Sequence, residues 1–236
     1  MRRLTRRVAP AAHWLGARAG DRLTGSVAVL SPHLDDGVFS LGAAIAASRA
    51  DVTIVTVFAC DPDSVAPAGE WDALAGFGTE GEAARARRHE DELACAIVGA
   101  RPVWLPFGDH QYAPPADDDL WRALEHAVAG AETVLVPAFP LMHEDHARLH
   151  DLVARNGFPG RAVGRYVEQP YAAAWTEPGP GDGWTPLAAA LPHRLAKLRG
   201  LRRYSSQLPL LERSGRVLLP LVRYEAGRGG ELVSWA

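Results

Sequence analysis

The sequence of 236 residues is poor in cysteine and has no long apolar run. Its two cysteines, Cys60 and Cys95, provide neither a disulfide framework nor a four-cysteine zinc site. Each lies beside an apolar run, and we expect both to be buried free thiols. No segment approaches the roughly 20 apolar residues that a membrane span needs. We therefore expect a cytoplasmic protein with no membrane span.

A basic excess is also missing. Lys and Arg number 25 against 28 Asp and Glu, which gives a formal net charge of −3. Nucleic-acid binders usually carry a basic excess, so we expect no nucleic-acid partner. Residues 23–181 hold 10 basic and 23 acidic residues, whereas both ends of the chain are basic. The acidic middle segment suits a site that binds a metal or releases an amine product. Alternatively, it only balances the charge of the basic ends across one surface. The oligomeric state does not follow from the sequence.

Apolar segments typical of strands alternate with segments typical of helices. Such alternation predicts a single-domain α/β fold, a Rossmann-like, mostly parallel sheet flanked by helices, over residues 26–236 after an N-terminal extension at 1–25. Ligands of such sheets bind beyond the carboxyl ends of the strands. The expected strands are residues 26–31, 51–59, 102–105, 133–137, 162–167 and a late strand at 216–222. The expected helices are residues 37–49, 80–98, 117–129, 146–156 and 186–204, with a long loop at 61–80.

Histidine and carboxylate residues follow the first expected strand, in the segment Ser31-Pro32-His33-Leu34-Asp35-Asp36-Gly37. A tight turn can bring His33 and Asp36 to a common point, with Asp35 nearby but separate. The alternative is structural: an aspartate caps the following helix, and His33 lies in a surface loop.

A second cluster follows the fourth expected strand and contains His143, Asp145, His146 and, four residues later, His150. His146 can bind a metal with His150 or with His143, or the segment is simply a solvated helix start. His33, Asp36 and one histidine of this cluster would form a set of two histidines and one carboxylate. Catalytic zinc sites have three such ligands and keep a position for water.

The remaining residues of the two clusters suit hydrolysis. Zinc lowers the pKa of its bound water to about 7. Asp35 is the natural general base beside the ligand Asp36. If His146 is the ligand, His143 is free to stabilise the oxyanion. We expect Asp145 to orient His143 and to raise its pKa, since a nearby carboxylate favours the imidazolium.

The SPHLDDG and HEDH segments together resemble the motifs of the PIG-L/LmbE-like deacetylases. These are zinc-dependent enzymes with a Rossmann-like fold that remove N-acetyl groups, mostly from amino sugars. The resemblance implies that His33, Asp36 and His146 bind Zn²⁺ or another divalent metal. It also implies that Asp35 is the general base and that His143, oriented by Asp145, stabilises the oxyanion.

Weaker similarities extend over residues 26–207. Arg87 resembles the arginine of the family's Arg-x-x-Glu helix. Asp109 lies where the family often has an acidic residue near the substrate. The resemblance implies that both residues bind substrate. Many members have Glu at the position of Gly37.

The resemblance implies that the substrate is an N-acetylated amino sugar or glycoconjugate. Candidates are an intermediate of thiol biosynthesis, an aminoglycoside and a glycopeptide. We also expect His110 and Tyr112 to line the pocket and the 61–80 loop to cover it.

Three alternative functions are compatible with parts of this pattern. A non-haem Fe(II) oxygenase could use His33, Asp35 and His146 as a facial triad. That triad normally lies in an all-β barrel, which the alternating pattern opposes. A related amidase would keep the metal chemistry but cleave a different amide. A non-catalytic binding protein with the same fold would need an incomplete catalytic site.

Overall fold

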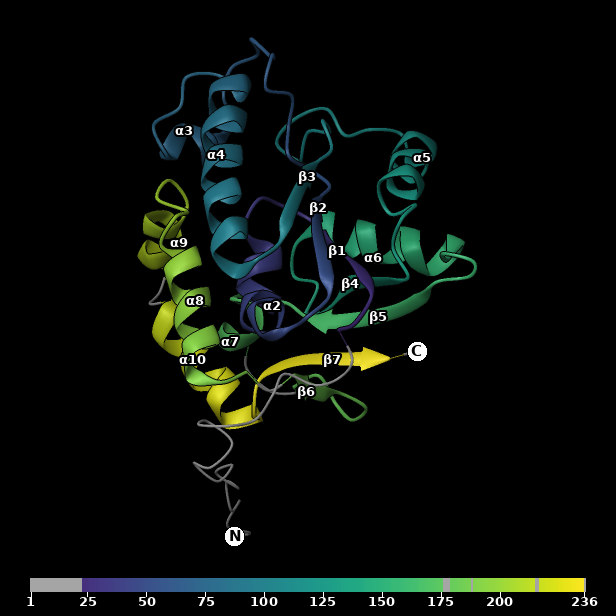
Figure 1. Cartoon of the computed structure of the whole chain (residues 1–236). Coiled ribbons are helices and arrows are strands. Elements are labelled where there is room, and N and C mark those ends of the chain that lie inside the picture. Colours follow the sequence, from purple (N-terminus) through teal and green to yellow (C-terminus); the bar gives the residue numbers. More distant parts are fainter. Residues whose placement is uncertain (1–22, 176–178, 188, 215–216, 236) are drawn as a thin grey trace, which may run out of the picture.

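A seven-stranded sheet forms the centre of the protein, in the order β3-β2-β1-β4-β5-β7-β6 (Figure 1). The computed structural model describes residues 23–175, 179–187, 189–214 and 217–235. The strands are β1 (Ser26–Ser31), β2 (Asp51–Thr56), β3 (Arg101–Trp104), β4 (Thr133–Phe139), β5 (Ala162–Val167), β6 (Thr185–Leu187) and β7 (Glu231–Trp235). β1 to β5 are parallel, whereas β7 is antiparallel to β5 and β6. The expected α/β fold is confirmed.

Helices cover both faces of this sheet. Residues of β1 alternate between two cores: Val27 and Val29 face one, and Ala28 and Leu30 face the other. Burial on both faces explains the continuous apolar run of β1. The first core is closed by α2 (Asp36–Ala47), α4 (Glu80–Val98), α8 (Leu191–Leu201) and α10 (Leu218–Arg228), the second by α5 (Asp117–Ala127) and α6 (Glu144–Asn156). Three shorter helices are α3 (Glu70–Leu74), α7 (Tyr171–Ala174) and α9 (Leu208–Ser214).

The sequence-based prediction is wrong near the C-terminus. The expected strand at 216–222 lies largely within the helix α10, and Leu221 buries its side chain in the first core. The helix expected at 186–204 begins only at Leu191, because β6 precedes it. The antiparallel strand β7 and the edge strand β6, which complete the sheet, were not expected. The short helix α3 lies within the loop expected at 61–80.

Other expectations concern the ends of the chain and the cysteines. Cys60 and Cys95 are buried free thiols, as expected. Among the described residues, no helix has the length and apolar character that crossing a bilayer demands. Residues 1–22 lie outside the described part, so the boundary of the N-terminal extension stays a prediction.

Candidate active site

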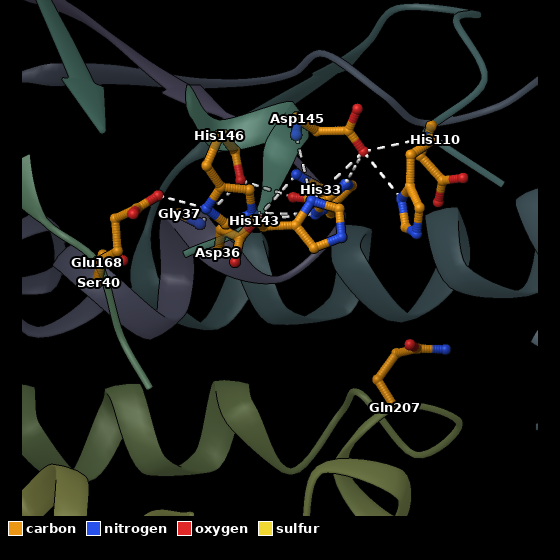
Figure 2. A network of polar contacts seen from close by, with 12 residues as sticks. His33, Asp36, Gly37, Ser40, His110, His143, Asp145, His146, Glu168 and Gln207 are labelled. Carbon is orange, nitrogen blue, oxygen red and sulfur yellow. Dashed lines mark hydrogen bonds and ion pairs between the residues drawn. The ribbon is translucent and has the colours of Figure 1, made fainter. Parts of the chain in front are cut away.

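The two histidine clusters meet because β1 and β4 are neighbouring parallel strands. Their carboxyl ends lie at the same edge of the sheet, so the turn after β1 faces the start of α6 (Figure 2). The sequence-predicted residues His33, Asp36, His143, Asp145 and His146 are thereby brought together.

Ser31 fixes the turn that presents the first cluster. Its Oγ donates to the carbonyl oxygen of His33 (2.7 Å) and accepts from the N–H of Gly37 (2.8 Å). The N–H of His33 donates to Asp36 Oδ2 (2.9 Å), which holds these two residues at one point. A Cβ at position 37 would lie 3.0 Å from Ile54 Cγ2. A larger residue at position 37 would therefore require the side chains of Ile54 and Ser31 to shift.

Three side-chain atoms form a small, nearly equilateral triangle. Asp36 Oδ2 lies 3.4 Å from His33 Nδ1 and 3.2 Å from His146 Nε2, and the two nitrogens are 3.2 Å apart. Zinc bonds of about 2.0–2.2 Å place neighbouring ligands of a tetrahedron about 3.3–3.6 Å apart. The three atoms therefore fit one face of a zinc tetrahedron and leave a fourth position for water.

A buried carboxylate lies behind each of these histidines. His33 Nε2 is 3.0 Å from Asp145 Oδ2, and His146 Nδ1 is hydrogen-bonded to Glu168 Oε1. The second oxygen of Glu168 accepts from the N–H of Leu141 (2.9 Å). Metal-binding histidines commonly donate their other nitrogen to a carboxylate, which fixes the tautomer. The sequence analysis missed Glu168; its position just after β5, at the same edge of the sheet, was the available signal.

The electrostatics of this cluster favour positive charge at its centre. Burial lowers the pKa of His146, but Asp36 and Glu168 outweigh it and raise this pKa to about 10. Burial also opposes charge on His33, whose pKa is raised to about 9 by Asp145 and Asp36. Although burial acts in the opposite direction, His146 and His33 hold the pKa of Asp36 well below its usual range. A divalent cation would satisfy the same demand for positive charge.

Asp35 lies beside this triangle rather than in it. Its backbone φ is 147°, a conformation that L-residues rarely adopt and that often marks functional positions. Its side chain lines the pocket together with His33 and His143. Burial, followed by the adjacent charge of Asp36, raises the pKa of Asp35 to about 8.

His143 caps the start of α6. Its Nδ1 accepts the N–H of Asp145 (3.3 Å), so in the neutral ring the proton is on Nε2. Burial and the nearby His33 and His146 lower the pKa of His143 to about 4. Asp145 raises this pKa, as expected, but burial and the two histidines outweigh its effect. Asp145 Oδ2 lies 3.6 Å from His143 Nδ1 and is hydrogen-bonded to His33 and His110 instead.

A cavity of about 610 Å³ opens in front of these groups. Its apolar wall comes from α3 and α9, and its polar wall comes from the two histidine clusters and the loop after β3. The lining residues are His33, Asp35, Glu70, Trp71, Leu74, Arg87, Asp109, His110, Gln111, His143, Tyr171, Gln207 and Leu211. His110 thus lines the pocket as expected, whereas Tyr112 does not.

Arg87 and Asp109 also line this pocket, and both are buried and already paired. Arg87 Nη1 lies 3.0 Å from Asp72 Oδ1. Its Nε is buried and has no hydrogen-bond partner among the described residues. Asp109 accepts from the backbone N–H of Gln111 (2.9 Å) and from its side-chain amide (3.1 Å).

Helix α3 covers the pocket, in agreement with the expectation for residues 61–80. The N–H of Trp71 donates to Gln111 Oε1 (2.6 Å), and its indole N–H donates to Gln207 Oε1 (2.7 Å). Tyr112 O–H donates to Asp72 Oδ2 (2.9 Å), and the N–H of Gly69 donates to the Tyr112 oxygen (2.9 Å). Trp71 is therefore held over the pocket from two sides.

Comparison with known proteins identifies the family. Residues 28–156, more than half of the chain, match the family model "PIG-L: GlcNAc-PI de-N-acetylase". The chain belongs to the PIG-L family. The 2'-N-acetylparomamine deacetylase of Streptomyces fradiae is 31% identical over 169 residues, which cover 63% of this chain and 58% of that protein.

Solved PIG-L-fold deacetylases have the same architecture. The A40926 pseudoaglycone deacetylase Dbv21 superposes with a TM-score of 0.73 at 26% identity, covering 91% of this chain and 97% of that one. A triple mutant of the Orf2 deacetylase of the teicoplanin biosynthetic pathway gives a TM-score of 0.73 at 24% identity, with 89% and 97% covered. At 24% identity, the similarity to this second structure shows a shared fold only. The Fe(II) oxygenase alternative is not supported, because this PIG-L member is an α/β protein with a mainly parallel sheet.

Proposed function

We propose that this PIG-L member removes the N-acetyl group from an amino sugar within a small glycoconjugate. The observation that carries the proposal is the triangle of His33 Nδ1, Asp36 Oδ2 and His146 Nε2 at the wall of the pocket, with donor separations of 3.2–3.4 Å. This set would hold Zn²⁺ or another divalent metal, which supplies a Lewis acid and a water of lowered pKa. Asp145 and Glu168 orient the two ligand histidines.

Asp35 acts as the general base. Its carboxylate takes a proton from the water that adds to the amide carbonyl carbon, and returns a proton to the nitrogen as the C–N bond breaks. Acetate and a free amine are the products. A pKa raised to about 8 by burial and Asp36 makes this carboxylate a stronger proton acceptor than an exposed aspartate.

His143 stabilises the negative charge on the carbonyl oxygen through its Nε2–H. Because its pKa is lowered to about 4, it does so as a neutral hydrogen-bond donor at physiological pH rather than as an imidazolium. A donor aimed at the developing oxyanion contributes to the rate without changing its own charge. The sequence had instead led us to expect a positively charged His143 in this role.

The pocket suits a substrate with a polar sugar and a larger attached group. Arg87 and Asp109 line the pocket and would bind sugar hydroxyls, and Trp71 and Leu74 offer an apolar wall to the remainder. The names of the relatives point in the same direction, since one is a deacetylase of 2'-N-acetylparomamine and another is a deacetylase of the A40926 pseudoaglycone. A cytoplasmic location and the absence of a nucleic-acid partner stay predictions.

A substrate panel tests this function. Zinc-loaded protein is incubated with N-acetylglucosamine, N-acetylparomamine and an N-acetylglucosaminyl glycopeptide, and released acetate and amine are both measured. We expect equal amounts of the two products from at least one conjugate. Protein that binds zinc but hydrolyses no member of the panel would contradict the proposal.

A further inference from the structure

Three arginines surround a second hollow of the protein, which we call the arginine hollow. Arg199, Arg202 and Arg203 line this open cavity of about 450 Å³ together with Ile97. Arg199 lies in the last turn of α8, and Arg202 and Arg203 follow directly after this helix. Ile97 belongs to α4, which packs beside α8 (Figure 1). The arginine hollow shares no lining residue with the cavity of the candidate active site.

The three arginines have no acidic partner among the described residues. All three are exposed, and their side chains form no ion pair or hydrogen bond within that part of the chain. Glu90 of α4 contacts the segment after α8, but its carboxylate accepts from Ser205 Oγ (2.6 Å), from the N–H of Ser206 (2.8 Å) and from Ser206 Oγ (2.7 Å). The serines therefore occupy this carboxylate, and the arginines keep their full charge.

The charge of the arginine hollow exceeds what the end of α8 needs. The carbonyl end of a helix carries a partial charge of about −0.5, which favours a cation in the last turn. Arg199 already provides that cation. Arg202 and Arg203 add two more positive charges three and four positions later, a helical spacing at which like charges repel. An anion bound among the three guanidinium groups would remove this repulsion.

We propose that the arginine hollow binds the phosphate groups of a phosphorylated small molecule. A guanidinium group presents its N–H donors in a rigid plane and binds two phosphate oxygens at once. One phosphate monoester carries a charge of about −1.5 to −2 at pH 7, so a diphosphate balances three arginines better than a single carboxylate does.

The size and the lining of the arginine hollow favour a small ligand. Its volume of about 450 Å³ lies within the range of small-molecule sites, about 300–1,000 Å³. Ile97 offers an apolar contact to the organic part of such a ligand. A nucleic-acid surface instead needs a long basic stripe, whereas this chain has a net charge of −3 and only three arginines line the hollow.

Equilibrium dialysis of the full chain against radiolabelled pyrophosphate, at constant ionic strength, tests the site. The wild type should bind one equivalent. Arg202→Ala should bind on the order of tenfold more weakly, because charged hydrogen bonds to phosphate are lost. Arg49→Ala also removes one exposed arginine, but one that does not line the hollow, and should bind like the wild type. Circular dichroism confirms that both variants are folded.

A chelator separates this site from the metal centre, since pyrophosphate also binds metal ions. The dialysis is repeated with phenanthroline, an uncharged chelator that keeps metal away from His33, Asp36 and His146. Binding should persist there with the same dependence on Arg202. Binding that phenanthroline abolishes would assign the anion to the metal centre and overturn the proposal.

Two other results would also contradict a site for a phosphorylated small molecule. One is a wild type that binds no pyrophosphate, or an Arg202→Ala variant that binds it equally well. The other is a protein that binds phosphatidylglycerol vesicles but not free pyrophosphate, because the arginines would then contact a membrane surface. None of these measurements uses hydrolysis, so their outcome is independent of the proposed deacetylation.

Discussion

Glu168→Gln is the substitution that probes the metal centre most selectively. Glu168 is fully buried and accepts two hydrogen bonds, from His146 Nδ1–H through one oxygen and from the N–H of Leu141 through the other. Glutamine has nearly the same shape but only one acceptor oxygen. Its NH₂ group must therefore face one of the two donors.

Each arrangement of the amide has a cost. If its oxygen faces Leu141, the NH₂ group faces His146 Nδ1 and favours the tautomer with the proton on Nε2, the atom that should bind metal. If the amide is reversed, the buried N–H of Leu141 loses its acceptor at a cost of about 1–3 kcal/mol. Loss of such a partner typically weakens metal binding about 10- to 100-fold. That range corresponds to about 1.4–2.8 kcal/mol.

The assay is the zinc dissociation constant, measured by competition with a chelating dye. Glu168→Gln should bind zinc about 10- to 100-fold more weakly. Glu144→Gln, which alters an exposed glutamate at the start of α6, should bind like the wild type. Circular dichroism confirms that both variants are folded. Unchanged zinc affinity in folded Glu168→Gln would refute the role given to this carboxylate.

Three further predictions concern catalysis and stability. Asp35→Asn should keep one tightly bound zinc and lower kcat by about 10²–10⁴-fold, because the proton acceptor is removed; unchanged acetate release would remove Asp35 from the mechanism. His143→Phe should lower kcat by about 10²–10³-fold with a small effect on KM; a KM effect alone would make His143 a binding residue. Lys197→Met leaves the buried carboxylates of Glu225 and Glu231 without their cation and should lower the free energy of unfolding by about 3–5 kcal/mol in urea denaturation. A loss below about 1 kcal/mol would show that these carboxylates are neutral in the folded protein.

The parallel core and the two clusters could be predicted because their signals are local. The apolar run of β1 gave its bounds, Ser26–Ser31, and the rule that ligands bind at strand ends pointed to His33 and His146. The run at 216–222 was misassigned because a short apolar segment fits either a strand or a buried helix. Only packing against the first core makes it part of α10.

The partners of the site carboxylates depend on contacts between distant segments. Glu168 follows β5 as a single acidic residue, and in sequence only its position at the end of an expected strand distinguishes it from a surface glutamate. Asp145 is two residues from His143, which favoured that pairing, but the fold places His33 and His110 closer to its carboxylate. Proximity in sequence was therefore the wrong guide to the partner of Asp145.

Acetate release during a zinc titration of metal-free protein tests the central claim most directly. With an N-acetylated amino-sugar conjugate as substrate, we expect no hydrolysis without metal and a rate that rises in proportion to the first equivalent bound. Asp36→Ala, which removes one corner of the donor triangle, should lose this response. Hydrolysis that persists after complete removal of metal, or a normal zinc response in Asp36→Ala, would contradict zinc-dependent deacetylation at His33, Asp36 and His146.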